Sequence, residues 1–441
     1  MLQVKILLPS GRAESILLAE SSKVGDLRIM AQKVVQQGFL RLVTEEGHIL
    51  SDPTESLLAA GIQDGDHLIA IAQQAGLEGT TKALAIWCFG GNRIVTWGHP
   101  DYGADCFATV KSVQKVQATE RAFAAILGEG SVVTWGHPDF GGDSSTVRDQ
   151  LNEVQHVQAT SRAFAAIVAD GSLVTWGHPD FGGDSSTVQD QLKDVQQVQS
   201  SAGAFAAILT DGSVVSWGHP RRGGNNTGVQ NWLRSVQQIQ ATIGAFAAIL
   251  ADGSVVTWGD PRYGGDSSAV RDQLNEVQHV QATWKAFAAI LADGSLVTWG
   301  HPDFGGDNSK VPSHVKNVQQ LKCTERAFAA ILSDGTVVAW GDPRYGGDSS
   351  EVQGQLRNVK QLEATEFAFA AILADRSVVT WGYPSFGGDH SQVQDGLRNV
   401  RQIHGANYAF VAVLDDGSVV TWGDPLYGGD SSKIHSQLRE L

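Results

Sequence analysis

Apolar and polar positions repeat with a fixed period along most of this chain. A phrase close to Ala-Phe-Ala-Ala-Ile-Leu-x-Asp-Gly-Ser-Val-Val-Thr-Trp-Gly occurs nine times, with successive Trp-Gly pairs 38 residues apart once and 41 residues apart thereafter. The tryptophans of these pairs are Trp97, Trp135, Trp176, Trp217, Trp258, Trp299, Trp340, Trp381 and Trp422. A period of this length predicts a stack of small repeats, each of which buries its apolar surface against its neighbours.

Each repeat predicts a β-hairpin. In the second copy an apolar run, Ala122–Leu127, is followed by a Gly-rich turn at 128–131 and a second apolar run at 132–135. Most copies have Asp-Gly in this turn, and Gly tolerates the positive φ that tight hairpins require. A short buried helix is the alternative for the first run, but its length and the flanking glycines favour a strand.

Both predicted strands are apolar on both faces. Phe123 and Ala125 point to one side of the first strand, and Ala124 and Ile126 point to the other. A strand of this kind needs a packed neighbour on each face, as a blade between two other blades has.

After the hairpin, each repeat predicts a loop, a short helix and a third strand. The loop at 137–143 reads His-Pro-Asp-Phe-Gly-Gly-Asp in the second copy, and Asp143 or the following Ser is placed to cap a short helix over 145–151. The segment 154–160, Val-Gln-His-Val-Gln-Ala-Thr, predicts a third strand that leads into the next hairpin.

The order of these signals resembles the regulator-of-chromosome-condensation repeat, in a short three-stranded form, and the related repeats of HERC-type proteins. The resemblance covers residues 83–441 and depends mainly on the Asp-Gly-x-Val-x-x-Trp-Gly core. It implies a mainly β fold, a β-propeller-like array of seven to nine blades. Nine Trp-Gly hairpins but eight Val-Gln strands are visible, so a ring and an open superhelix are both alternatives, and we favour the ring.

The first 74 residues lack the repeat and predict a separate α+β domain. Strands are expected over 2–8, 13–19, 39–43 and 67–72, a helix over 23–36 and a short helix over 54–60. This order, together with Arg41-Leu42-Val43, Leu50-Ser51-Asp52 and His67-Leu68-Ile69, resembles ubiquitin-like domains, which have a β-grasp fold. The predicted organisation is a ubiquitin-like domain at 1–74, a linker at 75–82 and the repeat array at 83–441.

The ubiquitin-like resemblance implies an apolar patch on the sheet that binds ubiquitin receptors. Its positions fall on Pro9, Val43 and Ile69, with His67 beside them. The alternative is that Val43 and Ile69 are ordinary sheet residues. A ubiquitin-like modifier would end in a free Gly-Gly near residue 74, whereas this chain continues, so the resemblance implies docking rather than conjugation.

Composition narrows the classes of partner. The 441 residues carry a net charge of −15, which disfavours nucleic acid and acidic membrane surfaces as partners. The three cysteines, Cys88, Cys106 and Cys323, have no metal-binding spacing. Because no signal peptide is visible and cysteines are few, we expect a cytoplasmic or possibly nuclear protein.

The sharpest candidate site is the repeated loop. Equivalent loop positions are expected to line one rim of the array, where they would grip a partner protein or a sugar. These residues are Tyr102, Phe140, Phe181, Arg222, Tyr263, Phe304, Tyr345, Phe386 and Tyr427, with Arg222 marking an irregular fourth copy. The alternative is that each aromatic side chain packs under its own loop.

The acid that ends the loop has a second interpretation as a cation ligand. Asn225 occupies this position in the fourth copy, and Asn caps helices about as well as Asp while carrying no charge. Capping is therefore favoured, and we expect no metal and no cofactor. The residue before the loop proline varies among His, Asp and Tyr, as surface loop positions do.

No catalytic motif is visible, so a non-enzymatic protein is expected. The leading hypothesis is a protein-protein interaction scaffold, whose repeat domain binds a client while the ubiquitin-like domain docks on ubiquitin or the proteasome. A guanine-nucleotide exchange regulator of a small GTPase is the second hypothesis, although the 41-residue spacing leaves no room for the segment that such exchangers insert. A HERC-like ligase-associated protein without the catalytic domain, an enzyme inhibitor and a carbohydrate binder are further alternatives.

Overall fold

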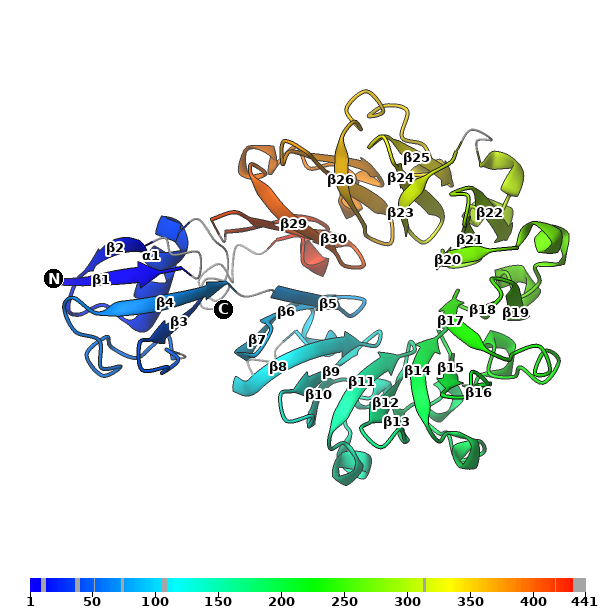
Figure 1. Cartoon of the computed structure of the whole chain (residues 1–441), viewed down its shortest axis with the longest axis horizontal. Coiled ribbons are helices and arrows are strands. Elements are labelled where there is room, and N and C mark those ends of the chain that lie inside the picture. The colour runs from blue at the N-terminus through cyan, green and yellow to red at the C-terminus, as the bar shows by residue number, and fades with distance from the viewer. Residues whose placement is uncertain are drawn as a thin grey trace.

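A computed structural model describes residues 1–8, 13–35, 40–50, 52–72, 75–104, 109–311, 315–416 and 418–430. The chain forms a small α+β domain followed by a ring of β-sheets, and the domain lies outside the ring beside its first and last sheets (Figure 1). The Arg41 guanidinium donates a 2.6 Å hydrogen bond to the Gly90 carbonyl and so joins the domain to the first sheet of the ring.

The N-terminal domain has one mixed sheet and one α-helix. Its elements are β1 (Leu2–Leu7), β2 (Ala13–Leu18), α1 (Val24–Val35), β3 (Leu40–Thr44) and β4 (His67–Ala72). The strand order is β2-β1-β4-β3, with β1 parallel to β4 and the other pairs antiparallel. Apolar residues of α1, such as Leu27 and Ala31, pack against Val4, Ile6 and Leu68 on one face of the sheet. The helix expected over 54–60 is wrong: this segment forms turns, because Ser56 bridges to Lys23 instead of continuing a helix.

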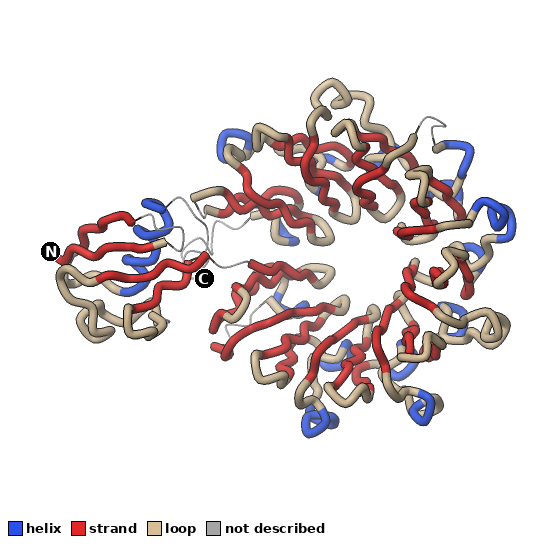
Figure 2. Tube along the Cα trace, in the orientation of Figure 1, coloured by secondary structure: helices blue, strands red, loops and turns tan. Residues whose placement is uncertain are grey.

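Within the described residues the ring consists of nine blades of three strands each, which confirms the mainly β, propeller-like fold class. β7 of the first blade pairs with β8 of the second, so these two blades form one six-stranded sheet, whereas the other seven are separate three-stranded sheets. In each blade the first strand lies beside the central opening, and the second and third follow outwards (Figures 1 and 2). The strands, blade by blade, are β5 (Ala75–Gly79), β6 (Ala83–Cys88), β7 (Gly91–Gly98); β8 (Thr109–Ala118), β9 (Ala122–Leu127), β10 (Val132–Gly136); β11 (Val154–Ala159), β12 (Ala163–Val168), β13 (Leu173–Gly177); β14 (Val195–Ser200), β15 (Ala204–Leu209), β16 (Val214–Gly218); β17 (Val236–Ala241), β18 (Ala245–Leu250), β19 (Val255–Gly259); β20 (Val277–Ala282), β21 (Ala286–Leu291), β22 (Leu296–Gly300); β23 (Val318–Cys323), β24 (Ala327–Leu332), β25 (Val337–Gly341); β26 (Val359–Ala364), β27 (Ala368–Leu373), β28 (Val378–Gly382); β29 (Val400–Gly405), β30 (Ala409–Leu414) and β31 (Val419–Gly423).

Short 3₁₀ helices follow the outer strands. One occurs in every loop of the repeat: Pro100–Tyr102, Pro138–Phe140, Pro179–Phe181, Pro220–Arg222, Pro261–Tyr263, Pro302–Phe304, Pro343–Tyr345, Pro384–Phe386 and Pro425–Tyr427. Further ones lie between blades at Ser145–Gln150, Gln189–Gln191, Ser268–Gln273, Asn308–Lys310 and Gln394–Gly396. In the part of the chain that the structure describes, no helix has the length and apolar character needed to cross a membrane.

The middle strand of each blade is buried on both faces. Phe123 and Ala125 of β9 pack towards the first blade, whereas Ala124 and Ile126 pack towards the third. This confirms the two-sided packing expected from the alternation of apolar positions. Burying a Phe side chain contributes about 1.5–3 kcal/mol, and the equivalent Phe of the middle strand is fully buried in every blade from the second to the ninth.

Each blade is also fixed to its neighbour by a tryptophan. Trp176 stacks on Phe164 of its own blade with ring centroids 5.1 Å apart, and its Nε1 donates a 3.0 Å hydrogen bond to the Gly141 carbonyl of the previous blade. The bond recurs at the other Trp-Gly positions, with Trp340 as the exception among the described residues. Sequence repetition therefore produces a repeated joint between blades.

The same joint closes the ring. Trp97 of the first blade donates its Nε1 hydrogen to the Gly428 carbonyl of the ninth blade, at 3.4 Å. Leu84 and Trp97 share one apolar cluster with Val411 and Val413 of the ninth blade. The ring is confirmed, and the open superhelix is excluded.

The linker expected at 75–82 is wrong over its first part, because Ala75–Gly79 forms β5 and pairs with β6. Thr80 follows β5 and donates to the Tyr102 carbonyl at 3.1 Å, as Thr119 donates to the Phe140 carbonyl in the next blade. Gly76 allows the close approach of Trp87, since a Cβ on Gly76 would lie 2.3 Å from the indole ring. This segment supplies the ninth inner strand that the Val-Gln pattern does not reveal.

Candidate functional site

The nine repeated loops lie at one end of the blades, and we call this end the loop face. Each loop has a left-handed glycine after its 3₁₀ turn: Gly141 has a φ of 87°, and a Cβ there would lie 2.6 Å from the Phe164 ring. In seven of the nine loops the side chain before the proline accepts a backbone N–H, as His137 Nδ1 does from Asp139 and Asp260 Oδ1 from Arg262, whereas His219 and Tyr383 make no such bond. His and Asp exchange at this position because either side chain can accept that bond.

The nine loop residues predicted to line the rim lie in a continuous belt. The residue that precedes each middle strand lies between two successive loop residues. We call the nine loop residues and these nine residues together the belt. The second set is Lys82, Arg121, Arg162, Gly203, Gly244, Lys285, Arg326, Phe367 and Tyr408.

Along much of the belt a cation lies between two aromatic rings. The Arg121 guanidinium carbon is 4.8 Å from the Tyr102 centroid and 5.0 Å from that of Phe140. Arg162 lies 4.9 Å from both Phe140 and Phe181. Each such contact stabilises by about 0.5–1 kcal/mol at exposed sites and by more when desolvated. We call the part of the belt in which a cation lies between two rings the cation arc; its cations are Lys82, Arg121, Arg162, Lys285 and Arg326.

The irregular fourth copy keeps this chemistry with the roles exchanged. Arg222 replaces the aromatic loop residue and lies 5.6 Å from the Phe181 ring. Glycine occupies the position before the middle strand in the fourth and fifth blades, and a Cβ on Gly203 would lie 2.7 Å from Arg222 Cδ. A cation in the loop thus goes with small neutral neighbours.

In the eighth and ninth blades aromatic rings replace the cations. Phe367 lies 5.1 Å from Tyr345 and 4.7 Å from Phe386, measured between ring centroids. Tyr408 lies 5.3 Å from Phe386 and 4.6 Å from Tyr427. We call this part of the belt, from Tyr345 to Tyr427, the aromatic arc.

None of the rim side chains predicted from the sequence is fully exposed. Phe140 and Phe304 are buried, and the other seven rim residues are half-buried. They pack against belt neighbours of their own and the next blade, as Phe140 does against Arg121 and Arg162, and their role in binding stays a prediction. The cations between them were not singled out from the sequence, although Lys or Arg precedes Ala-Phe-Ala-Ala in four copies, and Lys82 precedes the equivalent Ala-Leu-Ala-Ile in the first copy.

Inside the belt, a second circle of residues surrounds the opening. We call it the pore ring: Thr81, Glu120, Ser161, Ala202, Ile243, Trp284, Glu325, Glu366 and Asn407. Eight successive backbone hydrogen bonds of 2.8–3.3 Å run from the Thr81 N–H to the Asn407 carbonyl, each joining one blade to the next. The sequence analysis missed this circle, whose members share only their place after the Thr or equivalent residue that ends the inner strand.

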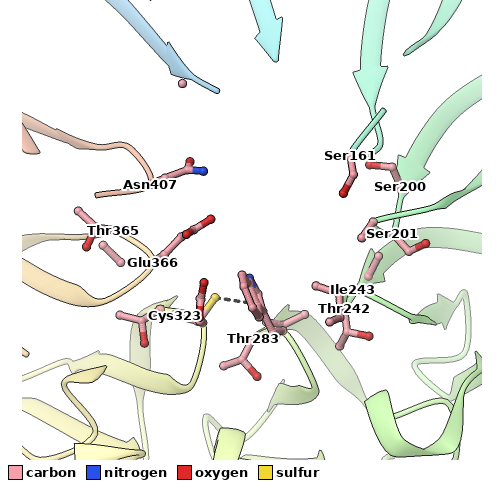
Figure 3. Close-up of a pocket in the computed structure, with 18 of the residues that line it drawn as sticks. Ser161, Ser200, Ser201, Thr242, Ile243, Thr283, Cys323, Thr365, Glu366 and Asn407 are labelled. Carbon is pink, nitrogen blue, oxygen red and sulfur yellow. Dashed lines mark hydrogen bonds between the residues drawn. The ribbon is translucent and has the colours of Figure 1, made fainter. Parts of the chain in front are cut away.

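The pore ring opens into a cavity of about 490 Å³ (Figure 3). Glu325 and Glu366 of the seventh and eighth blades line this cavity, as do Glu78 of the first blade and Ser161 and Ile243 of the third and fifth blades. Burial raises the pKa of Glu78 to about 8 and that of Glu325 to about 7. Burial, and then the nearby charge of Glu325, raise the pKa of Glu366 well above its usual value.

The acid that ends the repeated loop was the candidate cation ligand. Asp143 accepts the Ser145 N–H at 2.9 Å, and Asn225 accepts the Thr227 N–H at 3.0 Å, so this residue closes a turn two residues long. These bonds lower the pKa of the Asp143 carboxyl. The helix cap predicted here is not seen, because Ser144 precedes the 3₁₀ helix at Ser145–Gln150 and its side chain makes no cap bond. Among the described residues, no three His, Cys, Asp or Glu side chains gather as metal ligands would.

The cysteines offer no activated thiolate among the residues described. Cys88 and Cys323 are free thiols, and burial raises the pKa of each to about 12. A thiol must lose its proton to act as a nucleophile, so such a pKa argues against reactivity. Cys106 lies outside the described residues.

The patch predicted on the N-terminal sheet is partly described. Val43 pairs directly with Ile69 across β3 and β4, on the face away from α1, and Ile69 is 37% exposed. His67 lies two residues before Ile69 on the same face, with Nδ1 3.1 Å from a Glu45 carboxylate oxygen. Pro9 lies outside the described residues.

Comparison with known proteins shows likeness to solved structures only. No family model and no curated protein matches the sequence. Yeast RCC1 (Prp20), solved bound to Kap60, is 16% identical with a TM-score of 0.41, covering 83% of this chain and 91% of that one. Prp20p from Saccharomyces cerevisiae, in a study of its binding to Gsp1p and histones, is 15% identical with a TM-score of 0.40, covering 83% and 94%. The CRINKLY WD40 ectodomain of the Arabidopsis thaliana receptor kinase ACR4 is 16% identical with a TM-score of 0.34, covering 59% and 90%. At these values the likeness says nothing about the ligands or partners of this chain.

Proposed function

We propose that this protein is a non-enzymatic interaction scaffold whose loop face binds a client protein. The N-terminal domain would act as a ubiquitin-like docking module for ubiquitin or proteasome receptors. The two binding functions would then be held at a fixed relative position by the contact between Arg41 and Gly90.

The observation that carries the proposal is the contrast between loop frame and loop tip. The proline, the left-handed glycine and the packed belt residue recur, so the backbone of the loops is held in one form. The residue after the proline is exposed in every loop and varies: Asp101, Asp139, Asp180, Arg221, Arg262, Asp303, Arg344, Ser385 and Leu426. Variable tips on a rigid frame are typical of recognition surfaces.

The docking role of the N-terminal domain is supported by its topology and its exposed face. The strand order β2-β1-β4-β3, with the outer strands antiparallel to a central parallel pair and a helix across one face, agrees with a β-grasp fold. Val43 and Ile69 place apolar surface on the free face of the sheet.

Site-specific photo-crosslinking tests the client-binding face. A benzophenone amino acid would replace Asp139 or Asp180 at the loop tips of blades 2 and 3, and Asp170 or Asp211 in the turns at the other end of blades 3 and 4 as controls. We expect a defined protein adduct from the loop tips and none from the turns. Equal adducts from both ends, or none from the tips, would remove the proposal.

Titration with a proteasomal ubiquitin receptor tests the docking module. Ile69→Ala should weaken binding by about tenfold, as loss of a central apolar anchor does. Leu17→Ala is the matched control, because Leu17 is an exposed apolar residue on β2 at the far edge of the sheet. If the two variants bind equally well, the receptor does not use this patch.

A further inference from the structure

The cavity at the pore ring has two chemically different sides. Its volume of about 490 Å³ is in the range of sites that accept a small ligand or a long side chain. Glu366 lies on one side of the cavity, away from Ser161 and Ile243 (Figure 3). The Glu325 N–H donates to the Glu366 carbonyl at 2.8 Å, so Glu325 is its neighbour in the pore ring. The indole of Trp284, on the neighbouring blade, is 38% exposed although most large apolar side chains of the ring are buried.

The pore ring carries three carboxyls, and Glu366 differs from the other two. Glu120 is followed by Arg121 and Glu325 by Arg326, whereas Glu366 is followed by Phe367. The groups that act on Glu366 are Glu325 from one neighbouring blade, Tyr408 from the other and Glu120 across the ring joint. Deeper in the opening, Lys322 is paired with Glu363 at 3.0 Å. The Glu325–Glu366 pair is therefore buried with negative neighbours and with Arg326 as the nearest cation.

The belt shows which kind of side chain packs between the aromatic rings of this protein. In the cation arc, each gap between rings holds a Lys or Arg of the chain itself, as Arg162 lies between Phe140 and Phe181. In the aromatic arc no belt residue is a cation, and two of its rings, Tyr345 and Tyr408, lie close enough to the carboxyl pair to interact with its charge. Aromatic rings beside carboxylates form the usual surroundings of a bound ammonium or guanidinium group.

We propose that the mouth of the pore binds a lysine or arginine side chain from a basic segment of a partner protein, beside the Glu325–Glu366 pair and the aromatic arc. The inference deepens the proposed function by naming the chemistry of the client. A protein with a net charge of −15 attracts such a segment. The incoming cation replaces the proton that the carboxyl pair holds, and that proton passes to the buffer.

Isothermal titration calorimetry of the full chain with an acetylated, amidated hexalysine peptide at pH 7 tests the site. Glu325→Gln/Glu366→Gln should weaken binding by about tenfold, because the charge pair is lost from a desolvated site. Asp170→Asn/Asp211→Asn removes the same charge from exposed turns at the other end of the blades, and should weaken binding by less than about twofold. Circular dichroism of both variants confirms that the fold is kept.

Two further measurements separate the site from general attraction. The binding enthalpy of the wild type should vary with the ionisation enthalpy of the buffer by an amount equal to about one released proton, and the double Gln variant should lose this dependence. Phe367→Arg places in blade 8 the residue that blades 2, 3 and 7 already carry, and should weaken the peptide by a similar factor.

The outcomes distinguish the inference from the proposed function. Equal loss of peptide affinity in the two double variants, or a binding enthalpy that does not depend on the buffer, would overturn the pore-mouth site. Spermine that displaces the peptide and binds more tightly would also overturn it, because the site would then take a small polyamine and not a protein side chain. If loop-tip crosslinks then remain, the client binds the loop face through other chemistry and the scaffold function stands. If the crosslinks are also absent, both proposals are lost.

Discussion

Blades 3 and 9 have the same interior and different loop faces. Phe164 and Phe410 are both fully buried, and the indole N–H groups of Trp176 and Trp422 donate equivalent hydrogen bonds of 3.0 and 3.1 Å to the previous blade. On the loop face, blade 3 has Ser161 followed by Arg162, whereas blade 9 has Asn407 followed by Tyr408. Interior positions are constrained by a neighbour on each side, so repetition preserves them. The loop face is constrained on one side, and there the copies differ.

The largest effect should come from the shared interior. Phe164→Ala and Phe410→Ala should each cost about 3–5 kcal/mol of unfolding free energy, because both remove a buried ring stacked on a tryptophan. Differential scanning calorimetry and urea unfolding would measure this. If one substitution costs much less than the other, the interiors of the two blades are not equivalent, and the comparison fails at its foundation.

A smaller effect should appear with pH at the Glu325–Glu366 pair of the pore ring. The folded pKa of Glu325, about 7, lies above its ordinary value of 4.5, so the folded protein keeps a proton that the unfolded chain loses. The resulting stabilisation is complete below pH 4.5 and is lost as the pH rises through 7. We expect a loss on the order of 2–3 kcal/mol across this window.

Melting temperature against pH is the measurement. Glu325→Gln/Glu366→Gln should reduce the slope of the profile between pH 4.5 and 7, the window set by the ordinary and the folded pKa of Glu325, while Glu78, whose pKa burial raises to about 8, keeps part of the slope. Asp170→Asn/Asp211→Asn should leave this slope unchanged, because hydrogen bonds from Ser172 and Ser213 lower the pKa of these carboxyls. A flat wild-type profile would show that the carboxyl pair carries no shared proton.

The sequence predicted the features that recur in the blades and missed β5, the inner strand of the first blade, whose sequence departs from the repeat. Period, hairpin turn and two-sided strand were all visible in the nine copies, and the structure has all three. β5 was missed because Leu77-Glu78-Gly79-Thr80 keeps only its Thr in common with Val-Gln-Ala-Thr. What identifies β5 is the hydrogen bonding of Thr80 and the close fit of Gly76 against Trp87, which only the fold brings together.

The candidate site shows the same limit. The rim residues were predicted from their period, but the residues between them and the pore ring depend on contacts across blades. Arg121 and Glu120 are adjacent in sequence, yet one lies in the belt and the other in the pore ring. A period of 41 residues gives equivalence between copies and does not give the neighbours within each circle.

A third prediction concerns the belt itself. Arg162→Met keeps the apolar stem and removes a charge held between two rings, and should cost about 1 kcal/mol. Arg148→Met is the control, because Arg148 is an exposed cation in the same part of the ring and should change stability by less than about 0.5 kcal/mol. If Arg162→Met lowers the unfolding free energy no more than Arg148→Met does, the belt cations do not stabilise the cation arc.

The smallest expected effect lies at the opposite end of blade 8. Arg376 occupies the turn position that is Gly in the other copies of the repeat from the second to the ninth, and its φ of 66° is unfavourable for a side chain. Arg376→Gly should therefore stabilise by about 0.5–1 kcal/mol, reduced by loss of the ion pair with Asp415. Such an exposed pair contributes about 0–1 kcal/mol, so Arg376→Gly should be compared in the Asp415→Asn background as well. A gain that appears only there would mean that the ion pair maintains the strained turn. Loss of stability in both backgrounds would show that the aromatic-arc blades differ from the others at both ends and not on the loop face alone.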